Sequence, residues 1–256
     1  MLLGACSSGS AGKGSAATPT FTPTLPLSSS APLATTSSPP SSASTRPAQS
    51  SPVRTSSGAT HLPLGFTTGS ATQVITAQAP STTTTQGTLQ AWQKSGSGWV
   101  RVGPSVHAWF GSDGLTSHPS ETRSATPIGS FTLTEAFGGN ANPGTALPYR
   151  QTTPADWWIS QPGKLYNTEQ HCSSSCPFTQ GSPNEHLFYE RPYYDYAVVF
   201  DYNRFPVRQG AGSAFFLHVS VGAPTAGCVS IDKSELVRIL RWLKPADHPR
   251  MLIGVA

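Results

Sequence analysis

The chain has 256 residues, of which 36% are hydrophobic and 11% charged, with a net charge of +4 at pH 7 and an isoelectric point near 9.0. This is enough apolar material for one good-sized core. The basic residues are scattered, without a Lys/Arg cluster, which argues against nucleic acid as a partner, whereas a mildly basic surface suits anionic wall polymers. No apolar run is long enough to span a bilayer, so we expect membrane contact only through a lipid anchor.

The first six residues, Met1 to Cys6, look like the end of a bacterial lipoprotein signal, in which Leu-x-Ala/Gly-Cys marks cleavage and lipidation of the cysteine. The charged leader and most of the apolar region are missing, which indicates a start site assigned too late or a trimmed chain. A coincidental match is the alternative. The pattern predicts lipidation at Cys6 and an exported protein on the outer face of the cell membrane or in the cell wall.

A long segment of low complexity follows. From Ser7 to about Leu64 the sequence is almost entirely Ser, Thr, Ala, Pro and Gly, with very few large apolar residues. Such a segment cannot bury enough surface to fold. We therefore predict a disordered linker over 7–70, which would tether a folded domain over 71–256 and let it reach the cell wall.

The folded part is predicted to be mainly β. Short runs rich in Val, Thr, Trp and Phe recur between turn residues, as is typical of a β-sandwich or barrel. These runs predict strands over 72–79, 87–93, 98–103, 105–110, 129–135, 197–202 and 214–219, with a last strand from Met251 to Val255.

One helix is predicted near the C-terminus. Asp232 or Ser234 would cap it, and Pro245 would end it. Its apolar residues recur at helical spacing, as expected for a helix with one face on the core: Leu236, Ile239, Leu240 and Leu243.

Two cysteines, Cys172 and Cys176, lie close together in a polar loop. In an exported protein such a pair most often forms a disulfide that stiffens the loop. Zinc is the alternative because His171 and His186 lie nearby, but the spacing fits no familiar zinc module. We therefore predict a disulfide and no metal or other cofactor.

The chemistry of the chain is expected at His218 and Cys228, ten residues apart. A thiol needs a base or a positive neighbour to become the reactive thiolate, and a histidine on an adjacent segment can supply both. Taken singly, the histidine could be a satisfied core residue and the cysteine a small buried hydrophobe. Together they predict a cysteine nucleophile with a histidine base.

The sequence around His218 and Cys228 resembles that of the L,D-transpeptidase catalytic-domain (YkuD-like) family. In that family an apolar strand ends in His and is followed by a Ser/Thr-x-Gly-Cys-Ile/Val element, here Thr225 to Val229. The stretch 124–133, with Thr126-Pro127-Ile128-Gly129-Ser130-Phe131, looks like the family's T-P-x-G-x-F strand. The resemblance covers about 72–256 and is closest to the secreted, lipid-anchored actinobacterial branch.

The chain also departs from the family pattern. Many members have Gly directly after the His, a dozen or more residues between His and Cys, and Arg two places after the Cys. Here the corresponding features are Val219, a shorter interval, and Ser230. The missing Arg weakens any claim about how a substrate carboxylate is held, but leaves the nucleophile and base unchanged.

The resemblance implies acyl transfer on peptidoglycan stem peptides and sensitivity to carbapenem-type inhibitors. Cys228 would be the nucleophile, His218 the base, and the backbone carbonyl of Val219 would orient the His, with Ser220 as a rival. A short loop would return the chain to a second strand near Cys228, so that imidazole and sulfur meet across a β turn. The amides of Gly227 and Cys228 could then form an oxyanion hole.

Further residues are candidates for substrate binding. Thr225, Ser220 and Ser230 flank the predicted pair, and the aromatic and basic stretch 186–194 is a candidate substrate loop, although such aromatic residues are more often packing residues. Its candidates are Tyr189, Arg191 and Tyr193.

Two other functions compete with transpeptidation. Water could take the acyl group, which would give an L,D-carboxypeptidase or endopeptidase, or the chain could be an inactive wall-binding lipoprotein. A papain-like protease is disfavoured, because its Cys precedes its His and opens a helix.

Overall fold

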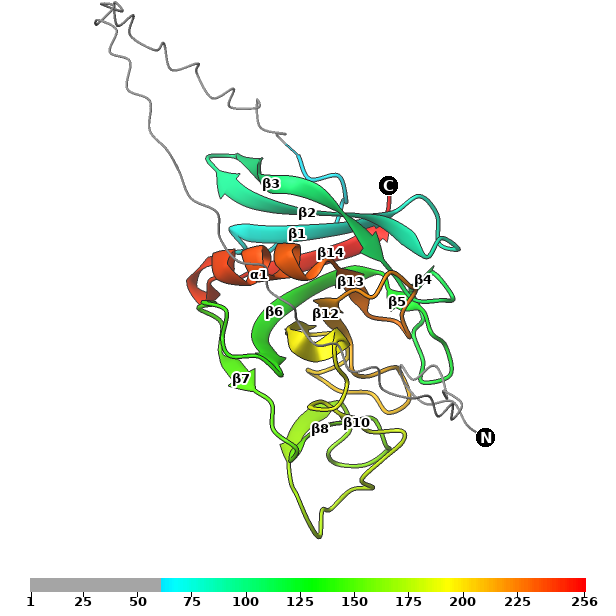
Figure 1. Ribbon diagram of the computed structural model, residues 1–256. Coiled ribbons are helices and arrows are strands. Elements are labelled where there is room, and N and C mark those ends of the chain that lie inside the picture. The colour runs from blue at the N-terminus through cyan, green and yellow to red at the C-terminus, as the bar shows by residue number, and fades with distance from the viewer. Residues whose placement is uncertain (1–60) are drawn as a thin grey trace, which may run out of the picture. The chain divides into compact units, whose positions relative to one another are not determined.

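The computed structural model describes residues 61–256 (Figure 1). Cys6 and most of the predicted linker lie outside the described residues, so lipidation and the tether stay predictions. Residues 61–70 contain no helix or strand, but Leu64 is buried with Trp92 and Leu252. The packed domain therefore begins a few residues before the predicted boundary at residue 71, because the apolar side chains at the end of the linker join the core. Within 61–256, no helix combines the length and apolarity needed to cross a membrane.

The fold is mainly β, as predicted, and is built on a nine-stranded sheet. The strands are hydrogen-bonded in the order β11-β12-β13-β3-β2-β1-β14-β6-β7, and an additional pairing of β11 with β6 closes the sheet on itself. The bounds are β1 (Gln73–Ala79), β2 (Gln86–Ser95), β3 (Gly98–Trp109), β6 (Gly129–Gly138), β7 (Tyr149–Gln151), β11 (Ala197–Phe200), β12 (Phe216–Val219), β13 (Val229–Ile231) and β14 (Arg250–Val255).

The two strands predicted over 98–103 and 105–110 form one strand, β3. Its pairing with β2 shifts register between Leu89 and Ala91, and Gly103 has a φ of +68° at this point. This is a β-bulge, at which the extra residues interrupt the alternation of side chains. The interruption explains why the sequence pattern predicts two strands.

The helix α1 (Lys233–Trp242) is confirmed, and Asp232 rather than Ser234 is its cap. The Asp232 carboxylate accepts a hydrogen bond from the Ser234 amide at 2.8 Å, which satisfies a donor at the start of the helix. The four predicted apolar residues of the helix are all buried in the main core with side chains from β1, β12 and β14. A short 3₁₀ helix, η2 (Pro245–Asp247), follows it.

A smaller three-stranded sheet, β10-β8-β9, forms a lobe beside the main sheet (Figure 1). Its strands are β8 (Asp156–Ile159), β9 (Thr168–His171) and β10 (Glu185–His186). The 3₁₀ helix η1 (Tyr193–Asp195) leads from this lobe to β11. A two-stranded pair, β4 (Leu115–Thr116) and β5 (Thr126–Pro127), completes the described strands.

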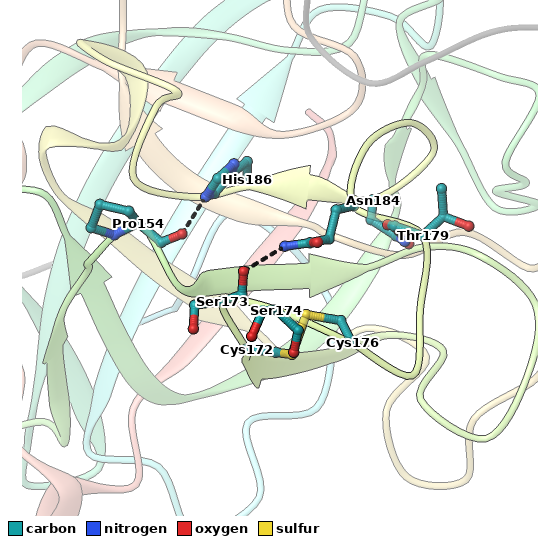
Figure 2. The surroundings of a disulfide bond; sticks show 9 residues. Pro154, Cys172, Ser173, Ser174, Cys176, Thr179, Asn184 and His186 are labelled. Carbon is teal, nitrogen blue, oxygen red and sulfur yellow. Dashed lines mark hydrogen bonds between the residues drawn. A yellow bond between two sulfur atoms is a disulfide. The ribbon is translucent and has the colours of Figure 1, made fainter.

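The lobe contains the predicted disulfide between Cys172 and Cys176 (Figure 2). Both sulfurs are used in this bond, so neither is available as a zinc ligand. The two nearby histidines have other partners: His171 Nδ1 lies 2.8 Å from Asp156 Oδ1, and His186 Nε2 donates to the Pro154 carbonyl at 2.7 Å.

The connection between β12 and β13 differs from the predicted turn. The strands are parallel, with Leu217 opposite Val229 and His218 opposite Ser230. Parallel neighbours cannot be joined by a tight hairpin, so the chain must first cross back to the other end of the sheet. Residues 220–228 make this crossing, and on the way Thr225 forms a bridge to Gly111 beyond the end of β3.

Candidate active site

Cys228 lies immediately before β13 and keeps its thiol in a buried position. The sulfur is held by backbone groups of the segment that leads into β12. It accepts a hydrogen bond from the Phe216 N–H and donates one to the Ala214 carbonyl, both at 3.4 Å. The S–H that is donated to a carbonyl keeps the sulfur as a thiol at rest, so a base must take this proton before the sulfur can act as a nucleophile.

His218 lies in β12, beside the strand that follows Cys228 (Figure 1). Residues in register on adjacent strands point to the same face, and side chains two apart on a strand share a face. Because His218 is opposite Ser230, Cys228 projects on the same side as the imidazole. The parallel pairing thus places the two predicted residues on one face of neighbouring strands, although not across a turn.

The imidazole is oriented by the backbone. His218 Nδ1 lies 2.9 Å from the carbonyl oxygen of Val219. A carbonyl can only accept, so Nδ1 carries the hydrogen and Nε2 is left as the basic nitrogen. Nε2 is buried and has no hydrogen-bond partner. The side chain of Ser220, the rival orienter, instead accepts a hydrogen bond from the Gly222 amide at 3.0 Å.

Burial keeps His218 neutral. Loss of solvation lowers its pKa from 6.5 to about 4, while the hydrogen bond to Val219 acts in the opposite direction. The rings of Tyr194 and Tyr193 contact the imidazole edge-on, with centroids 5.5 and 6.1 Å away. A neutral histidine at pH 7 can accept the proton of a thiol, as a general base must.

The loop before Cys228 is fixed by two threonines. The Thr225 hydroxyl donates to the Cys228 carbonyl at 2.6 Å and accepts from the Gly227 amide at 3.1 Å. The Thr126 hydroxyl donates to the same carbonyl at 3.3 Å and accepts from the Gly111 amide at 2.8 Å. The T-P-x-G-x-F motif therefore reaches the nucleophile through its first residue.

Gly227 is required at its position by its conformation and its surroundings. Its φ is +137°, and a Cβ there would lie 2.7 Å from the Phe215 ring. The predicted role of its amide in an oxyanion hole differs from what is observed, because this N–H donates to Thr225. The Gly227 amide would have to leave Thr225 before it could bind an oxyanion.

The other predicted substrate residues divide into two groups. Tyr193 and Ser230 lie at the histidine, by ring contact and by register respectively. Tyr189 is 62% exposed and packs edge-on against His186, and Arg191 forms an ion pair with Asp195. The structure thus does not bring Tyr189 and Arg191 to the nucleophile.

A cavity of about 90 Å³ opens in front of Cys228. It is lined by the loop 120–124, by residues 212–215 and by Glu185 of the lobe. Tyr194 donates a hydrogen bond to Glu185 Oε2 at 2.5 Å, so one tyrosine contacts both this carboxyl and His218. Burial raises the pKa of Glu185 to about 8.

No motif in the sequence singles out Glu185. The only available signal is its place directly before the aromatic stretch 186–194, and nothing in that pattern indicates that the chain folds back over the cysteine.

The L,D-transpeptidase catalytic domain family (YkuD) matches residues 83–252. The match includes the Thr126 motif, His218 and Cys228. No curated protein and no solved structure matches the chain. Since the family matches most of the sequence and all the strands of the site, the chain belongs to the L,D-transpeptidase catalytic-domain family.

Proposed function

We propose that this protein is a cysteine-dependent L,D-transpeptidase in which Cys228 is the nucleophile and His218 the general base. Enzymes of this family act on peptidoglycan stem peptides and are sensitive to carbapenems. The observation that carries the assignment is the neutral, buried His218, whose Nε2 has no hydrogen-bond partner, on the same face as the thiol of Cys228.

The reaction begins with a change of partner for the thiol. At rest the Cys228 S–H donates to the Ala214 carbonyl. Rotation of the side chain toward the imidazole lets Nε2 take the proton, and the sulfur attacks the carbonyl carbon at the L-centre of the third stem residue. The tetrahedral intermediate collapses to a thioester, and the proton on His218 leaves with the amine of the departing D-alanine.

The second half reaction restores the enzyme. The amine of a neighbouring stem attacks the thioester carbonyl and gives a proton to His218 Nε2. The new amide forms as the carbon–sulfur bond breaks, and the thiolate recovers the proton from the imidazolium. If water attacks instead, the same steps release a shortened stem.

We also propose that the domain works outside the cytoplasm. The disulfide between Cys172 and Cys176 supports this location, because such bonds persist in oxidising compartments. Lipidation of Cys6 would hold the domain at the membrane surface. Metabolic labelling with a fatty acid, compared with a Cys6→Ala variant, tests this anchor.

The test of the reaction is mass spectrometry of the domain with a disaccharide tetrapeptide that contains a diamino acid. A cross-linked dimer that lacks one D-alanine indicates transpeptidation, and a monomer that lacks D-alanine indicates hydrolysis. Cys228→Ala should abolish the thioester and both products. Release of D-alanine by this variant at the parent rate would refute the assignment of the nucleophile.

A further inference from the structure

The cavity in front of Cys228 contains a buried carboxyl that the proposed mechanism does not use. Glu185 is 6% exposed and lines the same cavity as the nucleophile. Burial of a carboxyl group is costly unless its oxygens find partners. The hydrogen bond from Tyr194 satisfies Oε2 and fixes the side chain, so a ligand in the cavity meets a carboxyl group already held in position.

Glu185 is held by the lobe rather than by the main sheet. In β10 it lies opposite Trp158 of β8, and the next residue, His186, stacks on Trp157 at a centroid distance of 3.8 Å. The adjoining Asn184 accepts the Ser160 and Gln161 amides at 2.8 and 2.9 Å. The carboxyl is therefore part of a fixed wall of the cavity and not the end of a mobile loop.

The charges around this carboxyl favour a cation. Glu121 lines the same cavity, and both Glu121 and Glu190 raise the pKa of Glu185 through their charges. Glu121 itself accepts hydrogen bonds from Tyr166 and Ser213. Arg123, the cationic residue of the lining, donates to the Thr116 hydroxyl at 3.3 Å. An ammonium group that enters would find carboxyl groups in a poorly solvated site, where the attraction between opposite charges is strong.

The proposed donor stem carries such a group. Its third residue is a diamino acid, and its side chain places an ammonium at the end of a flexible carbon chain while its carbonyl is the point of attack. Because Cys228 and Glu185 line the same cavity, a single substrate residue could reach both of them.

We propose that Glu185 is a specificity-determining residue whose carboxylate binds the side-chain ammonium of the donor's diamino acid while Cys228 attacks the carbonyl of that same residue. This inference rests on the proposed function. The ammonium ionises Glu185 on binding, and the proton of the neutral carboxyl is released to solvent.

The experiment measures formation of the thioester by mass spectrometry in a single turnover, without an added acceptor. The donors are a tetrapeptide with lysine at the third position and the same peptide with the lysine amine acetylated. The variant is Glu185→Gln, which keeps an oxygen for Tyr194 and removes the negative charge. Glu169→Gln, which changes a carboxyl group of β9 that does not line the cavity, is the matched control.

With the lysine peptide, we expect Glu185→Gln to lower the rate constant of acylation divided by the dissociation constant about thirtyfold, as for loss of a charged hydrogen bond. With the acetylated peptide the parent should already be slow, and the variant should differ from it by less than about threefold. Glu169→Gln should behave like the parent with both donors.

An equal loss with both peptides, or no loss with either, would overturn the role of Glu185. Complete acylation of the variant by a β-lactam without a cationic group checks that the variant keeps a folded, reactive site. If the parent forms a thioester with neither peptide, the proposed function fails, whereas acylation of the parent without discrimination refutes only this inference.

Discussion

Acid should destabilise the protein through His218 in a way that a single substitution removes. The buried imidazole has a pKa of about 4, against 6.5 for an unperturbed histidine. Between these values the unfolded chain binds a proton that the native protein does not, so stability rises with pH. This contribution is complete above about pH 6.5 and is lost as the pH falls to about 4. The gap corresponds to about 3 kcal/mol in the free energy of unfolding.

The measurement is urea unfolding of the parent and of His218→Gln at intervals from pH 4 to pH 7.5. Other groups, including Glu185, titrate in both proteins, so only the difference between the two curves reports on His218. For each pH unit below 6.5, the folding equilibrium constant of the parent should fall about tenfold relative to that of the variant. Parallel curves across this range would show that His218 is not a buried neutral base, and the mechanism would lose its proton acceptor.

Four more predictions concern the site and the lobe. Replacement of both Cys172 and Cys176 by Ala opens a short loop and should lower the free energy of unfolding by about 2 kcal/mol, measured by urea unfolding with and without reductant. Thr225→Val leaves the Gly227 amide without its acceptor, so it should lower the free energy of unfolding by about 2 kcal/mol and slow acylation by a β-lactam. Thr225→Ser keeps the hydroxyl and should keep the stability and the acylation rate of the parent. Gly227→Ala should destabilise by about 1–3 kcal/mol because of its φ of +137° and its contact with Phe215, seen as a lower Tm. His218→Gln should slow acylation of Cys228 by at least about a hundredfold at pH 7 in stopped-flow measurements, and an unchanged rate would exclude it as the base.

Much of the fold follows from local patterns in the sequence. Most strands of the main sheet have long apolar or alternating runs, and α1 has both a cap and an apolar face, so they could be located without tertiary information. The exception is β7, which has only three residues and is largely exposed. The strands of the lobe could not be located in this way either. β10 has two residues and β9 has four polar ones, and they are strands only because β8 lies between them. Their hydrogen bonds depend on tertiary contacts, which the spacing of apolar residues in the sequence does not reveal.

The nucleophile and base could be predicted because the chemistry requires a cysteine and a histidine, and both lie within a recognisable motif in the expected order. Their geometry could not, because a separation of ten positions between His218 and Cys228 fits a hairpin as well as a parallel crossing. What decides between them is the bridge from Thr225 to Gly111, a contact across more than a hundred residues of sequence. Glu185 could not be predicted for the same reason: its place at the cavity depends on how the lobe folds back, which its neighbours in sequence do not indicate.

The two titrating groups of the site have opposite shifts with one cause. Burial lowers the pKa of His218 and raises that of Glu185, so both side chains are neutral at pH 7. In our proposal a bound ammonium shifts Glu185 toward its charged form, and the two opposite charges then compensate each other inside the buried site. His218 stays neutral and able to accept the proton of the thiol. An uncharged side chain leaves Glu185 protonated, so Glu185 would select the donor through binding while the base acts in the same way on every donor.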